Sequence, residues 1–97
     1  MTKHDKLRKE IDEIDQELMR LFEKRMQISE EIAQYKYSQN IAVFDSSREK
    51  EVIDKNVSLI ENQSLKLYGE LFVKNLMGLS KKHQNDSINH MKVSHKS

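Results

Sequence analysis

An apolar residue recurs every three or four positions through the first third of the sequence, and this pattern constrains the fold more than any other feature. Such spacing places apolar side chains along one face of an α-helix, with solvated charges on the other faces. The helix is expected from about Asp5 to Tyr37, opened by a capping box of Thr2 and Asp5. Its apolar seam consists of Leu7, Ile11, Ile14, Leu18, Leu21, Ile28, Ile32 and Tyr35.

One position on this seam is charged, because Arg25 stands where the pattern requires an apolar residue. A cation on a helix-packing face is costly unless an anion meets it. One interpretation is an arginine that sets the register of packing helices or extends its charged end into solvent. The other is a binding site for an anionic ligand, and the remaining polar residues favour it.

The length of this helix bears on assembly. It would measure about 50 Å, whereas a compact globule of this size is about 33 Å across. One copy of the chain cannot bury the whole seam. We therefore expect an obligate, intertwined helical homodimer, most simply with two-fold symmetry.

Composition agrees with an all-α protein: the chain has 97 residues, 34% of them charged, with two glycines and no proline. Seventeen basic and sixteen acidic residues give a net charge of +1, which provides no reason to expect a nucleic-acid or membrane partner. The absence of cysteine excludes disulfides and thiolate chemistry. His90 and His95 are not spaced as a ligand pair on one helix face, so no metal or cofactor is predicted. With no leader-like or membrane-spanning segment in the sequence, a cytoplasmic protein is expected.

Two further helices are expected, giving three per chain and one domain over residues 1–85. A turn after Tyr37 leads into a short apolar loop packed on the helices. The second helix should open at residues 45–47, with Ser46 and Glu49 forming a capping box, and break near Asn62. The polar tail, residues 86–97, is expected to fray or be disordered. The third helix should begin near Ser64, with Leu65, Tyr68, Phe72, Leu76 and Leu79 on its inner side.

The polar residues at unusual places are mostly cations and hydrogen-bond donors. The sequence offers no nucleophile with a positioned base, no metal-binding cluster and no glycine-rich phosphate loop. This set favours recognition of a small polyanion, with any catalysis by positioning and electrostatics. The residues are Arg8, Arg25, Lys36, Arg48, Glu49, Ser80 and Gln84.

Helical geometry divides the cations of the first helix into two groups. Arg25 and Lys36 lie close to three turns apart, about 16 Å, so their long side chains can converge on one ligand. Arg8 lies about 25 Å before Arg25, too far for one chain to place both on a small molecule. If two first helices cross antiparallel near Leu18 and Met19, Arg8 of one chain falls opposite the stretch between Arg25 and Lys36 of the other. The prediction is two identical sites per dimer, each with a borrowed arginine.

Three segments together resemble the all-α chorismate mutase family: LRKEIDEIDQELMRLFEKRMQISEEIAQYK at residues 7–36, DSSRE at 45–49 and SKKHQ at 80–84. The resemblance covers roughly residues 5–85. It implies a chorismate mutase of aromatic amino-acid biosynthesis, an isomerase that rearranges chorismate to prephenate without a cofactor.

The resemblance also implies roles for individual residues. Arg25 and the partner's Arg8 would bind the two substrate carboxylates, Lys36 a carboxylate and the ether oxygen, and Gln84 the ether oxygen. Glu49 and the backbone at Asp45 would hold the ring hydroxyl beside Arg48, and Ser80 would touch a carboxylate. By this reading the catalytic residues are Arg25, Lys36, Glu49 and Gln84.

Two alternatives remain open at this point. An isochorismate pyruvate-lyase of the same fold needs nearly the same cage for a dianion, and it would release pyruvate instead of forming prephenate. A non-catalytic helical dimer that regulates another aromatic-pathway enzyme would keep the pocket with little turnover.

Overall fold

A computed structural model describes residues 1–95 and contains three helices. They are α1 (Lys3–Ser38), α2 (Ser46–Ser58) and α3 (Lys66–His95), with a short 3-10 helix, η1 (Gln63–Leu65), before α3. The described residues include no strand, so the all-α prediction is confirmed. None of these helices is long and apolar enough to cross a membrane.

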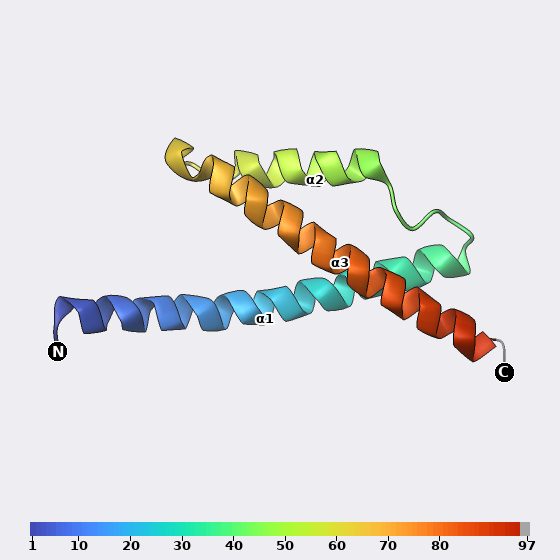
Figure 1. The fold of residues 1–97 in the computed structure, drawn as a ribbon, viewed down its shortest axis with the longest axis horizontal. Coiled ribbons are helices and arrows are strands. Elements are labelled where there is room, and N and C mark those ends of the chain that lie inside the picture. The colour runs from blue at the N-terminus through green and yellow to red at the C-terminus, as the bar shows by residue number, and fades with distance from the viewer. Residues whose placement is uncertain (96–97) are drawn as a thin grey trace.

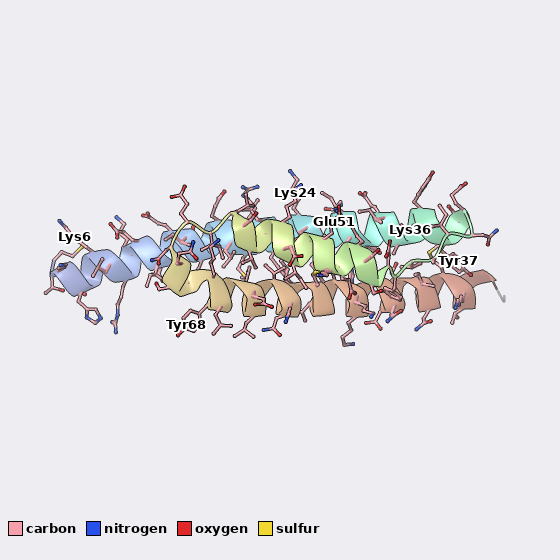
Figure 2. The ribbon with its side chains drawn as sticks, turned by 90° about the horizontal axis from the view of Figure 1, so that it is seen from above. Lys6, Lys24, Lys36, Tyr37, Glu51 and Tyr68 are labelled. Atoms are coloured by element: carbon pink, nitrogen blue, oxygen red, sulfur yellow. The ribbon has the colours of Figure 1, made fainter. Side chains whose placement is uncertain are left out.

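The helix α3 organises the fold because it packs on both other helices (Figure 1). It crosses the C-terminal half of α1 and lies along α2 with its N-terminal half. Side-chain hydrogen bonds join residues of α1 to residues 53 to 55 positions later in α3, so the two helices run in the same general direction. The molecule is thin when seen from above (Figure 2), and its extents are 60 × 29 × 14 Å.

Local signals fix both ends of α1. The Thr2 hydroxyl accepts a hydrogen bond from the Asp5 amide at 3.1 Å and the Asp5 carboxylate accepts one from the Thr2 amide at 3.2 Å, which confirms the predicted capping box. At the other end Asn40 adopts a φ of 57°. This left-handed residue lets the Ile41 amide reach back to the Lys36 carbonyl at 2.8 Å and end the helix. The turn directs the chain from α1 towards the start of α2.

The start of α2 differs from the prediction. Its N-cap is Asp45, whose carboxylate accepts hydrogen bonds from the amides of Ser47 and Arg48. The predicted capping box of Ser46 and Glu49 is therefore wrong, because the N-cap is Asp45, one residue before Ser46. Glu49 lies beyond the cap, and its carboxylate is left for other partners.

The cap makes a pH-dependent contribution to α2. Hydrogen bonds from the Ser47 hydroxyl and the Arg48 amide hold the pKa of Asp45 below its ordinary value of 3.8. A carboxyl group whose pKa is lowered on folding stabilises the fold above its unfolded pKa, and this stabilisation is lost as the pH falls through the folded pKa. We expect the protection of α2 amides against exchange, taken relative to their intrinsic exchange rate at each pH, to fall below about pH 4. Because asparagine also caps helices but does not titrate, this protection in Asp45→Asn should depend less on pH in this range. An identical pH dependence in both proteins would contradict this role.

The inner face of α3 also differs from the prediction. Val73, Ser80 and Ile88 are its buried residues, and Tyr68, Phe72 and Leu79 are exposed. Gly69 lies on the inner side, where a Cβ would overlap the side chain of Ile60. The small residue thus allows α3 to lie close to the end of α2, whereas the large apolar residues point elsewhere.

The C-terminal segment continues α3 instead of fraying at Asp86. The helix extends to His95, and the buried Ile88 anchors this last part. Ser87 also joins α1, since its hydroxyl accepts a hydrogen bond from the Gln34 amide at 3.2 Å. Residues 96 and 97 of the predicted tail lie outside the described residues, and a domain boundary at residue 85 stays a prediction.

The first half of α1 has no cover in the single chain. Leu7, Ile11 and Ile14 of the predicted seam are 47%, 58% and 63% exposed. The chain exposes 8073 Å², whereas a compact protein of this mass exposes about 5,800 Å². The buried apolar residues of the described chain are only Ala33, Val73 and Ile88. One copy therefore leaves most of its apolar seam exposed to water.

Candidate active site

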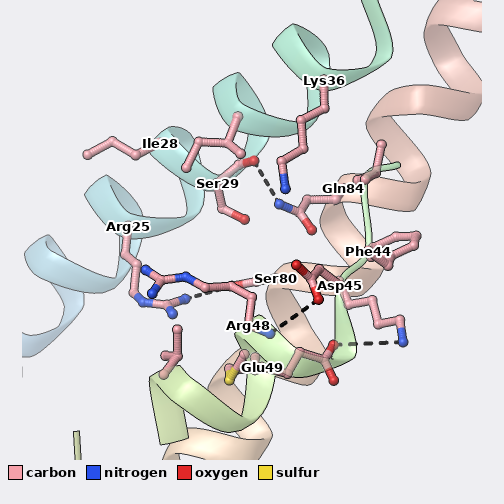
Figure 3. A pocket seen from close by; sticks show the side chains of 15 residues that line it. Arg25, Ile28, Ser29, Lys36, Phe44, Asp45, Arg48, Glu49, Ser80 and Gln84 are labelled. Atoms are coloured by element: carbon pink, nitrogen blue, oxygen red, sulfur yellow. Dashed lines mark hydrogen bonds and ion pairs between the residues drawn. The ribbon is translucent and has the colours of Figure 1, made fainter. Parts of the chain in front are cut away.

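A pocket of about 320 Å³ lies between the C-terminal half of α1, the loop after it, the start of α2 and the middle of α3 (Figure 3). Three separate stretches of the sequence, residues 25–36, 43–52 and 77–84, therefore contribute to one site. The predicted site residues that line it are Arg25, Lys36, Asp45, Arg48, Glu49, Ser80 and Gln84.

Arg25 reaches this pocket from the seam of α1. Its guanidinium donates a hydrogen bond from Nη1 to Oγ of the buried Ser80 at 2.8 Å. The Ser80 hydroxyl in turn donates to Sδ of Met26 at 3.6 Å. No carboxylate of residues 1–95 forms an ion pair with Arg25. The structure thus holds a half-buried cation on a neutral hydroxyl, with its charge uncompensated.

Lys36 and Gln84 both extend into the pocket opposite Arg25 (Figure 3). The Gln84 amide donates from Nε2 to the main-chain carbonyl of Ser29 at 2.9 Å. This bond fixes which end of the Gln84 side chain is the NH₂ group. Because that group has two hydrogens, the second remains for an acceptor in the pocket.

A polar cluster beside Gln84 holds α3 against α1. Nε2 of His83 lies 3.0 Å from the Glu30 carboxylate, and the Gln34 amide donates to the same carboxylate at 3.1 Å. The Ser87 hydroxyl donates to it as well, at 3.3 Å. These contacts fix the register of the two helices next to Gln84. The residues of the cluster therefore position Gln84, although they do not line the pocket themselves.

The charge of the lining is unbalanced. Arg48 has an acidic neighbour outside the pocket, since its Nη1 lies 3.4 Å from the Glu51 carboxylate. Asp45 is occupied by the helix cap. The lining carries four cations against two carboxylates, a net charge of +2, which suits a small dianion: Arg25, Lys36, Arg48 and Lys81 against Asp45 and Glu49.

Arg8 is the predicted site residue that the single chain does not bring to the pocket. It is exposed in the first half of α1, seventeen residues before Arg25. At 1.5 Å per residue this separation is about 25 Å. Only a second chain could therefore place an Arg8 beside this pocket.

Next to the pocket is a second, apolar hollow of about 430 Å³ between α1 and α3, which we call the apolar groove. It includes some of the large exposed residues of α3, and Arg25 belongs to its wall as well as to that of the pocket. Its lining consists of Leu18, Met19, Leu21, Phe22, Arg25, Phe72, Asn75, Leu76 and Leu79.

Two polar contributors to the pocket were not predicted. Ser29 supplies a main-chain carbonyl, which leaves no signal in a sequence. Lys81 lies in a run of polar residues, and nothing in its spacing separates it from the exposed Lys82. Its position one residue after Ser80 is the only available signal, because it places Lys81 at the edge of the same helix face.

Comparisons with known proteins agree with the resemblance found in the sequence. Residues 7–85 match the model of a family described as chorismate mutase type II. The chain is also 33% identical over 72 residues to the bifunctional chorismate mutase/prephenate dehydratase of Aquifex aeolicus (strain VF5). This match covers 74% of the present chain but only 19% of the length of that relative.

Proposed function

Since the chain belongs to the chorismate mutase type II family, we propose that it rearranges chorismate to prephenate in the pocket between its three helices. The observation that carries this proposal is the net charge of +2 on a lining whose Arg25 has a neutral partner, Ser80, and no carboxylate partner among the described residues. Chorismate is a dicarboxylate, so its two charges match this excess. The proposal is confined to the mutase reaction, because the matched part of the bifunctional relative is a small fraction of that protein.

The reaction needs no nucleophile or base because it is unimolecular: one carbon–oxygen bond breaks as one carbon–carbon bond forms. Its catalyst must hold the reactive conformation and stabilise negative charge that grows on the ether oxygen. In the proposed complex Arg25 binds a carboxylate, and Lys36 binds a carboxylate and the ether oxygen. Gln84 donates its second amide hydrogen to the same oxygen.

The remaining lining residues would bind the rest of the substrate. Glu49 accepts a hydrogen bond from the ring hydroxyl, with the backbone at Asp45 beside it. Arg48 lies beside the ring hydroxyl. Ser80 contacts both Arg25 and a substrate carboxylate. The hydrogen bond from Arg25 to Ser80 and the release of Glu49 from the helix cap support these two roles.

We also propose that the active form is an intertwined homodimer in which the partner's Arg8 completes each site. The chain exposes about 2,300 Å² more than a compact protein of its mass, within the range that one subunit of an obligate dimer buries. The uncovered seam of α1 and the apolar groove account for part of that surface. An antiparallel partner helix would cover both and carry its Arg8 towards the pocket.

The test of function is a pair of turnover assays. The protein should convert chorismate to prephenate and should release no pyruvate from isochorismate. Pyruvate release would instead establish the lyase. If neither product forms while the protein is folded, a non-catalytic regulatory dimer becomes the better account.

Replacing Gln84 with glutamate should make activity depend on acid. The new carboxylate would face the Ser29 carbonyl at the position where Nε2 now lies 2.9 Å away, and it can donate a hydrogen bond only when protonated. We expect kcat/KM of Gln84→Glu to rise as the pH falls below neutral. The measurement is a pH profile of wild type and variant. Full activity at neutral pH would remove Gln84 from the site.

A further inference from the structure

Lys81 connects three parts of the pocket wall. It belongs to α3, yet its Nζ lies 5.1 Å from the centroid of the Phe44 ring in the loop and 3.8 Å from Oε1 of Glu49 in α2. The first distance is within the range of a cation–π contact. The second joins α2 to α3 at the pocket, where the ion pair of Glu49 is drawn dashed in Figure 3.

The two residues that Lys81 contacts have weak local support. The loop is fixed at its beginning by the turn at Asn40 and at its end by the Asp45 cap. Phe44 lies between these two points and is part of the lining. Glu49 makes no capping bond, so its carboxylate is not held from within α2. Lys81 therefore contacts both a loop ring and a carboxylate that the α2 cap does not hold.

We propose that Lys81 is a positioning residue that holds the Glu49 carboxylate and the Phe44 ring against the pocket. The inference rests on the proposed function, in which Glu49 accepts a hydrogen bond from the substrate hydroxyl. A carboxylate close to a dianion is repelled by it, and the ammonium group of Lys81 offsets this repulsion. Lys81 itself touches neither the ether oxygen nor the substrate carboxylates in this arrangement.

How exposed these contacts are to solvent determines which property of a Lys81 variant should change. The side chains of Lys81 and Glu49 are 50% and 40% exposed, and ion pairs of this kind add little to global stability. The thermal midpoint of a Lys81 variant should therefore stay close to that of wild type. The effect should appear in substrate binding and in the local dynamics of the loop.

The experiment compares three variants. Lys81→Met keeps much of the side-chain length but removes the charge, and Lys81→Arg keeps the charge. Lys82→Met is the matched control, because Lys82 is an exposed neighbour that pairs with Asp86 within α3 and is not part of the pocket lining. For each protein we would measure kcat and KM for chorismate and amide exchange over residues 41–48.

In Lys81→Met we expect KM to rise roughly tenfold with kcat within about twofold of wild type, given the size of two weak charge contacts. Exchange in the loop should accelerate several-fold. Lys81→Arg should recover most of both properties, and Lys82→Met should match wild type. In a Glu49→Gln background, Lys81→Met should raise KM by less than in wild type, because part of its effect passes through Glu49.

Two results would overturn the inference. Unchanged KM and unchanged exchange in Lys81→Met would show that the contacts do not position anything. A fall in kcat at constant KM would place Lys81 among the groups that act on the reacting atoms. If wild type itself does not turn over chorismate, the proposed function fails, whereas the exchange comparison still decides whether Lys81 tethers the loop.

Discussion

Arg25→Ala is expected to reduce kcat/KM for chorismate by roughly 30- to 5,000-fold, because a charge-assisted pair with a buried carboxylate is worth about 2 to 5 kcal/mol. Within residues 1–95 Arg25 has a neutral partner, Ser80, and no carboxylate. Removing the guanidinium should therefore relieve an uncompensated charge and leave the fold intact. Turnover assays together with circular dichroism and the thermal midpoint would separate the two effects.

The matched control for this prediction is Arg20→Ala. Arg20 belongs to the same helix but points to solvent, where it pairs with Glu17, and it is absent from the lining of both the pocket and the apolar groove. Its replacement should leave turnover unchanged. If Arg25→Ala unfolds while Arg20→Ala does not, Arg25 has a structural role on the seam, and its assignment to an anion-binding site is wrong.

The second prediction with a large expected effect is that a refolded mixture of two inactive variants recovers activity. Arg8→Ala and Arg25→Ala homodimers should each be nearly inactive, since every site lacks one arginine. A heterodimer of the two variants has one site that lacks both arginines and one site in which both arginines are present. Unfolding and refolding an equimolar mixture should give heterodimers as about half of all dimers, and hence about a quarter of wild-type activity per chain.

Each parent refolded alone provides the baseline for this mixture, and sedimentation confirms that dimers have formed again. Activity at the baseline in a mixture that contains dimers would mean that both arginines serve the same chain's site. The proposed antiparallel crossing near Leu18 would then be wrong, because that crossing is what brings the partner's Arg8 to the pocket.

The parts of the fold that depend on neighbouring residues could be predicted from the sequence. The seam of α1, the capping box of Thr2 and Asp5, and the turn after Tyr37 are determined within a few residues. The position of Arg25 on that seam is equally local. For this reason periodicity alone was enough to single out the charged pocket residues of α1.

Features that depend on which neighbour covers a helix could not be predicted. Both faces of α3 carry apolar residues, and periodicity favoured the larger ones at Tyr68 and Phe72 over Val73 on the face that packs within the chain. Lys81 was missed for a related reason, because only the folded arrangement brings Phe44 and Glu49 to it. The polar segment after Asp86 suggested fraying, and the single anchor at Ile88 was too weak a signal to outweigh it.

Arg25 lies in the walls of both the pocket and the apolar groove, and this position couples two equilibria: ligand binding and association of the chains. In the proposed dimer, a ligand that needs Arg25 and the partner's Arg8 binds only the assembled form, and by mass action it raises the apparent association constant of the chains. Thermodynamic reciprocity requires that dilution, which separates the chains, weakens binding of that ligand by a corresponding amount. The supply of substrate would then set how much catalyst is assembled as well as how fast it works.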